Sequence, residues 1–104
     1  MKETQVRVSR PMLMVLKMMI EKPRTPYSGA DIARQVGLGS GTLYPLLQRL
    51  ENAGWMKSEW EDVDPAEAGR PRRRLYKLTG HGQTRAVQAL AEVQTAPGVL
   101  VWGS

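Results

Sequence analysis

Hydrophobic residues first recur at helical spacing after a polar and basic start. The repeats fall at i, i+3, i+4, i+7 and i+8, on Met12, Val15, Leu16, Met19 and Ile20. Such spacing puts the apolar side chains on one face of an amphipathic helix. Pro11 suits the first turn, where a missing N–H leaves no hydrogen bond unmade, and either Ser9 or Arg10 is the cap. The pattern predicts a helix that stops before the prolines of EKPRTPYSG.

Shorter helical patterns follow on either side of the tetrapeptide GLGS. Ser28 is the expected cap of the first, and Gly37 ends it where a left-handed glycine is favoured. Its expected buried residues are Ile32, Ala33 and Val36. Ser40 is the expected cap of the second helix, which fades at Asn52 and Gly54. Its apolar face consists of Leu43, Leu46, Leu47 and Leu50. Two short helices joined by a tight turn predict a helix-turn-helix.

The second half of the chain changes to extended segments and ends in a helix. The flanks WMKSEWED and RRRLYKLT predict the strands of a hairpin, joined by the long loop VDPAEAGRP. Thr79 is the expected cap of the last helix, with Val87, Leu90 and Ala91 turned inward. The order of these elements predicts a mainly α fold with a small β-hairpin wing, a winged helix-turn-helix followed by a C-terminal helix.

Composition excludes many kinds of chemistry. The chain has the length of one domain, with 104 residues, no cysteine and one histidine, His81. Disulfides, thiolate nucleophiles and zinc sites built from cysteine and histidine are therefore excluded, and no cofactor is predicted. Nothing pairs a nucleophile with a base, so we do not expect an enzyme. The apolar stretches are too short to span a bilayer and no signal peptide is recognisable, which indicates a cytoplasmic protein without a membrane partner.

Positive charge is concentrated near the end of the hairpin loop. The formal net charge of +5 suits a polyanionic partner. The segment GRPRRRLYK gathers Arg70, Arg72, Arg73, Arg74 and Lys77. A charge run is usually a solvated surface, but this one lies where a wing meets the phosphate backbone or minor groove. The acids of the hairpin are expected to pair with some of the arginines; they are Glu59, Glu61, Asp62, Asp64 and Glu67.

The glycines of GLGSGTLYPLL present a choice between a phosphate cradle and a turn. A nucleotide loop needs a preceding strand and, in a P-loop, a lysine followed by serine or threonine. Both are missing, so the turn is the favoured interpretation. The following helix carries a face rich in hydrogen-bonding groups and free of acids before Glu51, which suits a DNA major groove. That face consists of Ser40, Thr42, Tyr44, Pro45, Gln48, Arg49 and Asn52.

Two longer motifs connect the chain to a known family. The run GTLYPLLQRLENAGWMKSEWED, followed by GRPRRRLYKLTGHG, closely resembles the PadR family of bacterial winged-helix transcriptional regulators. The resemblance covers roughly residues 12–91. It implies a homodimer that binds a palindromic operator in double-stranded DNA and usually represses transcription. The third helix would lie in the major groove and the wing on the flanking backbone.

The resemblance also locates the DNA-binding residues. Carried over by position, the recognition helix holds Thr42, Tyr44, Pro45 and Arg49. The wing holds Arg70, Arg72 and Arg73. Together with the exposed positions inferred above, the predicted DNA-binding set is Ser40, Thr42, Tyr44, Pro45, Gln48, Arg49, Arg70, Arg72, Arg73 and Arg74.

The C-terminus departs from the family pattern. Members commonly dimerise through a long last helix or a separate helical domain, whereas only a short segment follows the hairpin here. The predicted organisation is an N-terminal segment and winged-helix domain over residues 1–78, followed by a C-terminal helix and tail over 79–104 that serve as the dimerisation element.

Ligands and alternative functions remain open at this stage. Some relatives bind planar aromatic compounds between the subunits, and Trp55, Trp60 and Trp102 are candidates for such a platform. Packing in the core or at an interface is the more common use of tryptophan. A winged-helix adaptor for another protein and an architectural DNA-binding accessory protein are the alternatives to a repressor.

Overall fold

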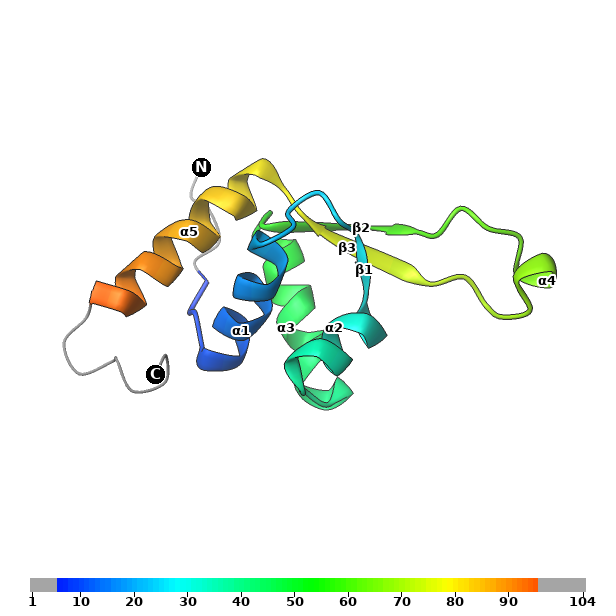
Figure 1. Cartoon of the computed structure of the whole chain (residues 1–104), viewed down its shortest axis with the longest axis horizontal. Helices are drawn as coiled ribbons and strands as arrows, with labels where there is room; N and C mark the ends of the chain where they lie inside the picture. Colours follow the sequence, from blue (N-terminus) through cyan, green and yellow to red (C-terminus); the bar gives the residue numbers. More distant parts are fainter. Residues whose placement is uncertain (1–5, 96–104) are drawn as a thin grey trace.

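The computed structural model describes residues 6–95 as a helical body that carries a small sheet (Figure 1). The elements in chain order are α1 (Arg10–Ile20), β1 (Tyr27–Ser28), α2 (Gly29–Val36), α3 (Ser40–Asn52), β2 (Met56–Trp60), α4 (Pro65–Ala68), β3 (Arg74–Leu78) and α5 (Gly80–Thr95). In Figure 1, α1, α2 and α3 lie below the sheet, and the β2–β3 hairpin extends away from the helices with α4 at its tip. The predicted winged helix-turn-helix with a C-terminal helix is confirmed. Predictions for the tail after residue 95, including Trp102, lie outside the described residues.

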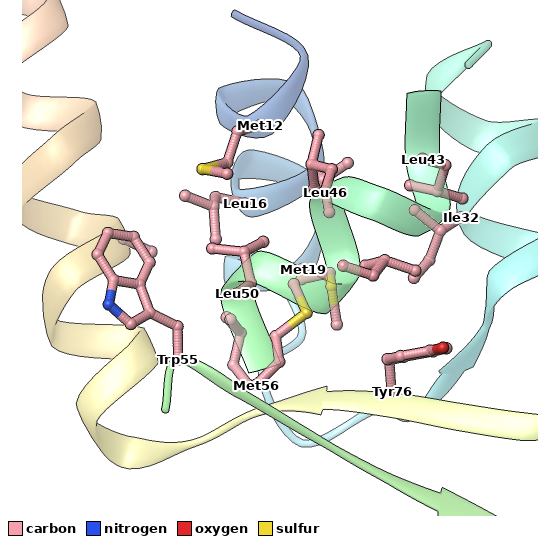
Figure 2. Packing of buried hydrophobic residues seen from close by; sticks show 14 of the residues in the cluster. Met12, Leu16, Met19, Ile32, Leu43, Leu46, Leu50, Trp55, Met56 and Tyr76 are labelled. Atoms are coloured by element: carbon pink, nitrogen blue, oxygen red, sulfur yellow. The ribbon is translucent and has the colours of Figure 1, made fainter. Parts of the chain in front are cut away.

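The core forms between α1 and α3, as the apolar spacing predicted. The expected residues of α1 are buried except Ile20, which packs at the margin, and the four leucines of α3 are all buried (Figure 2). Full burial of one leucine contributes about 2 kcal/mol to the stability of the fold. The start of α1 is as predicted, because the Ser9 hydroxyl accepts a hydrogen bond of 3.3 Å from the N–H of Met12. Two stripes of apolar side chains therefore position α3.

The turn between α2 and α3 also forms, with one difference from the prediction. The Ser28 hydroxyl accepts a hydrogen bond of 3.1 Å from the N–H of Asp31, and Gly37 ends α2 with a left-handed φ of 72°. Ser40, however, does not cap α3. The extended backbone that a cap requires falls at Gly39, which has no side chain to donate or accept, and Ser40 lies in the first turn of the helix.

Some short elements were not predicted. Strand β1 adds Tyr27 and Ser28 to the hairpin, giving a three-stranded antiparallel sheet with the order β1-β3-β2. Tyr27 pairs with Tyr76, so β1 depends on a partner almost fifty positions away and has no periodicity of its own. Helix α4 forms inside the predicted loop, where the Asp64 carboxylate accepts a hydrogen bond of 2.9 Å from the N–H of Ala66.

The inward face of α5 was predicted incorrectly. Val87 is 56% exposed, Ala91 is exposed and Leu90 is only partly buried. The buried side chains are instead those of Ala86 and Ala89. Helix α5 packs against α1 through small side chains, which allow the two helices to approach closely. An apolar strip of α5 is consequently left on the surface.

The start of α5 packs closely against the backbone of Trp55. Thr79 caps the helix as predicted, because its hydroxyl accepts a hydrogen bond of 2.9 Å from the N–H of Gly82. A Cβ atom at Gly82 would overlap the backbone carbonyl of Trp55. The Trp55 ring is 3% exposed and lies beside α5 (Figure 2). Gly82 is therefore required for the contact, because any larger residue would place its Cβ atom on the Trp55 carbonyl.

Candidate nucleic-acid interface

The outer face of α3 is a polar surface without a carboxylate. All predicted residues of this helix are exposed: Ser40, Thr42, Tyr44, Pro45, Gln48 and Arg49. Burial of the leucines on the opposite side fixes this orientation. Nε2 of Gln48 donates a hydrogen bond of 3.0 Å to Oδ1 of Asn52, one turn further along the same face. The acid of the helix, Glu51, is partly buried at its side. The outer face is therefore able to approach phosphates without charge repulsion.

Tyr44 is oriented by the beginning of α2. Its ring covers Gly29 so closely that a Cβ atom at residue 29 would lie 2.5 Å from the Tyr44 hydroxyl oxygen and 2.7 Å from Cε1. The remaining 46% of the side chain is exposed. A side chain that is already oriented loses less conformational entropy when it binds a partner. The absence of a side chain at Gly29 thus allows Tyr44 to adopt this orientation at the edge of the α3 outer face.

The wing comprises β2, β3 and the loop over residues 61–73. The Glu61 carboxylate holds the two ends of this loop together, and we call this arrangement the closure of the wing. Nη1 and Nη2 of Arg70 donate to its two carboxylate oxygens at 2.6 and 3.0 Å. The N–H of Arg73 donates to the same carboxylate at 3.2 Å. Hydrogen bonds from Arg70 are the main reason that the pKa of Glu61 falls to about 2. The predicted pairing of hairpin acids with arginines is confirmed at Glu61, and it occupies Arg70.

Two other arginines of the wing carry charge on the surface. Nε of Arg72 donates a hydrogen bond of 2.9 Å to the carbonyl of Val63, which leaves its terminal amino groups available. The Arg73 side chain is exposed. Within residues 6–95, neither guanidinium forms an ion pair, and the same is true of Arg49 on α3. These three cations are available to an anionic partner.

Arg74 connects the wing to α3. Its Nε donates a hydrogen bond of 2.8 Å to the hydroxyl of Ser58, and its Nη2 lies 3.7 Å from Oε2 of Glu51. Its guanidinium carbon lies 5.4 Å from the centre of the Trp60 ring. A role for Ser58 was not predicted. Alternation along the predicted strand WMKSEWED places Ser58 on the same face as Trp60, but only the register in the structure pairs Trp60 with Arg74.

The two tryptophans that the structure describes have different environments. Trp55 is packed in the core, which confirms the packing interpretation for this residue. Trp60 is 61% exposed, so a core role is wrong for it. Because one ring is buried and the other lies on the surface, they do not form a single aromatic platform within one subunit.

Other kinds of site have no support in the part of the chain from residue 6 to residue 95. There, no three histidine, aspartate or glutamate side chains are grouped to hold a metal ion. None of the helices in this part combines the length and the apolar character needed to cross a membrane.

Comparison with protein families identifies the relationship. Residues 15–88 match the transcriptional regulator PadR-like family. The chain belongs to this family. The matched range begins in α1 and ends in α5, so it contains α3 and the entire wing. The prediction of a PadR-like, DNA-binding transcriptional regulator, and not an enzyme, is confirmed at the level of the family.

Solved structures share the fold. AbfR of Staphylococcus epidermidis is 29% identical, with a TM-score of 0.64 over 86% of this chain and 54% of AbfR. Reduced AbfR bound to DNA is 30% identical, with a TM-score of 0.64 over 82% of this chain and 56% of the other. The smu.1704 protein of Streptococcus mutans UA159 is 26% identical, with a TM-score of 0.65 over 88% of this chain and 84% of the other.

These similarities have limits in length and chemistry. The chain spans between 54% and 63% of the AbfR chains that it matches. AbfR has also been solved in a disulfide-formed state, whereas the present chain contains no cysteine and cannot form that bond. No curated protein shows significant similarity to the sequence.

Proposed function

We propose that this PadR-like protein binds a palindromic operator in double-stranded DNA as a homodimer and represses transcription. The observation that carries the proposal is the combination of an acid-free outer face on α3 with cations on the neighbouring wing. The DNA-bound form of AbfR supports DNA as the partner. Two-fold symmetry of a dimer would match the two halves of a palindrome.

The contacts divide into base reading and backbone binding. Gln48 and Asn52 present amide groups, and amides read base edges in the major groove. Thr42 and Tyr44 lie on the same exposed face of α3 and supply hydroxyl groups, with Ser40 at the start of the helix and Pro45 also exposed. Arg49, Arg72 and Arg73 supply cations for phosphates.

The other two arginines of the predicted set, Arg70 and Arg74, contribute mainly to the structure of the wing. Arg70 is held by Glu61, and Arg74 is held between Ser58, Glu51 and Trp60. Their charges are partly neutralised by carboxylates, so they contribute less to the attraction of DNA than Arg72 or Arg73 does. Their main contribution is to fix the shape and direction of the wing.

The apolar strip of α5 is the proposed dimer contact. Val87 is exposed and Leu90, one turn further along, is only partly covered. A second copy of the chain that packs α5 against this strip would bury both side chains. Val87→Glu would introduce a charge into that contact, and sedimentation velocity of the variant should then show monomer. An unchanged dimer would exclude this surface.

The central experiment is a fluorescence titration of the protein against its own upstream promoter DNA and a scrambled duplex at two salt concentrations. The proposed function requires a preference for the promoter that persists at the higher salt concentration. Equal binding to both duplexes that disappears with salt would contradict sequence-specific regulation. That result would favour the architectural alternative, and no binding at all would favour the protein adaptor.

Two variants test the division of contacts. Arg72→Ala should weaken binding to both duplexes and reduce the dependence of affinity on salt by about one phosphate contact. Gln48→Ala should instead reduce the preference for the promoter by about 10-fold, since an amide–base contact contributes about 1–3 kcal/mol of discrimination. Arg24→Ala, in the turn between α1 and β1, is the control that should leave both quantities unchanged. An equal loss on both duplexes for Gln48→Ala would contradict its role in base reading.

A further inference from the structure

The wing carries an open hollow with an unusual lining. Its residues are Trp60, Pro65, Ala66, Arg70, Pro71 and Arg72. The lining combines apolar rings with guanidinium groups and contains no carboxylate, although the loop that forms it is rich in acids. We call this surface the wing hollow. It offers both apolar contact and positive charge to a ligand.

A second hollow on the wing is mixed in charge, and Trp60 lines it as well as the wing hollow. It lies over the sheet face that carries Lys57 and Lys77, and both lysines line it. Three acids also line it, Glu59, Glu61 and Asp62. A polyanion would meet carboxylates on this surface. The distribution of acids therefore favours the wing hollow as the side that faces a polyanion.

Trp60 is placed to make a contact within the wing hollow. The Arg74 guanidinium covers part of the ring and so restricts its orientation. The remaining 61% of the side chain is exposed, which is a large apolar area to leave in water. Ser58, on the same strand face as Trp60, bonds to Glu51 of α3. The ring thus projects from the wing surface that continues from α3.

We propose that the wing hollow seats the sugar–phosphate backbone of DNA, with Trp60 packed against a deoxyribose ring. Arg72 donates from its terminal amino groups to the adjoining phosphate, because only its Nε is used by the Val63 carbonyl. Arg70 shapes the hollow and is held there by Glu61. This inference rests on the proposed function, and it adds an apolar contact to a wing otherwise described by its charges. The deoxyribose is common to all sequences, so the contact raises affinity and does not read bases.

The test compares Trp60→Ala and Trp60→Phe with the wild-type full chain in the same titrations. Trp60→Ala should weaken binding to promoter and scrambled DNA by the same factor, about 10-fold, a value typical of one lost aromatic packing contact. The dependence of affinity on salt should not change, because no charge has been removed. Trp60→Phe keeps an aromatic face and should bind within about 3-fold of wild type. Arg72→Ala is the matched comparison, since it should reduce the salt dependence.

A second measurement reports on contact directly. Acrylamide quenches exposed tryptophan, so the part of the emission that Trp60→Phe removes should be quenched readily in free protein and protected in the DNA complex. This measurement also decides the matter if Trp60→Ala does not fold.

The outcomes separate this inference from the proposed function. If Trp60→Ala binds DNA with wild-type affinity, or if DNA does not protect the Trp60 emission from quenching, the inference is overturned. The proposed function as a DNA-binding regulator would be unaffected by either result. A loss of affinity with the same fall in salt dependence as Arg72→Ala would also overturn the inference, because Trp60 would then act only by positioning cations. Failure of the wild type to bind any duplex would remove the proposed function and the inference together.

Discussion

The hydroxyl of Ser58 donates a hydrogen bond of 2.6 Å to Oε2 of Glu51 and so joins β2 to the last turn of α3. Arg74 of β3 completes the connection, since it donates to Ser58 and lies near the same carboxylate. The direction of the wing relative to α3 is therefore fixed by side chains from three elements. In a winged helix that contacts DNA, this direction determines whether both surfaces reach the duplex at once.

Removal of the Ser58 hydroxyl should weaken this connection. Ser58→Ala leaves the partly buried Glu51 with one hydrogen bond fewer, and we expect it to lower the free energy of unfolding by about 1 kcal/mol. Urea denaturation measures the loss. Ser40→Ala removes a serine hydroxyl from the exposed first turn of α3 and should change stability by less than about 0.5 kcal/mol. Equal stability of the two variants would show that the bond contributes nothing.

The closure of the wing should depend on pH. The pKa of Glu61 is lowered to about 2, mainly by hydrogen bonds from Arg70, whereas in the unfolded chain it returns to about 4.5. A carboxyl with a depressed folded pKa adds stability that is complete above the unfolded value and is lost as pH falls toward the folded value. We therefore expect faster amide hydrogen exchange in the wing loop as pH is lowered from about 4.5 to 2, after correction for intrinsic exchange.

A variant isolates this effect. Glu61→Gln cannot titrate and should show accelerated wing exchange at every pH, with no additional change across the acid range. Carbon-detected NMR titration of wild-type Glu61 gives the pKa directly. A titration midpoint of Glu61 near 4.5 would contradict the hydrogen bonding of its carboxylate by Arg70.

The junction between β2 and α5 should tolerate no side chain at residue 82. Gly82→Ala would drive its methyl group into the backbone carbonyl of Trp55, which cannot move without the start of β2. We expect a loss of about 2–3 kcal/mol, as for other overpacked sites, measured by urea denaturation. Gly80→Ala is the matched control, because nothing lies within 4 Å of a Cβ atom there. Similar stabilities for the two variants would show that α5 moves away from Trp55 and accommodates the methyl group at little cost.

The contact between Gly29 and Tyr44 should affect DNA binding more than stability. Gly29→Ala pushes on the far end of the Tyr44 side chain, which is free to rotate outward at a cost of about 1 kcal/mol. The displaced hydroxyl should reduce affinity for promoter DNA severalfold. The stability of Gly29→Ala should be restored by Tyr44→Ala, since the double variant has no clash. Additive losses of stability in the double variant would contradict the proposed contact.

The sequence by itself determined the longer helices α1, α2, α3 and α5, most of the core and the order of these helices and of the hairpin strands. Apolar residues at 3.6-residue spacing define α1 and α3, because a helix must bury one stripe of its surface. Gly37 and Ser28 identified the ends of α2 through local backbone chemistry. The exposed residues of α3 followed directly, since they are the positions opposite the leucines. These features depend on neighbours a few positions away, and sequence patterns record such neighbours well.

The tertiary structure decided the features that depend on distant partners. Strand β1 exists because β3 lies beside it, and α5 turns Ala86 inward because Trp55 admits only a small neighbour at Gly82. The arginines of the wing look equivalent in the sequence, yet Arg70 and Arg74 are held by carboxylates while Arg72 and Arg73 carry their charge to the surface. That distinction arises from strand register and loop closure, which set the distances between charges and are not encoded in any local pattern.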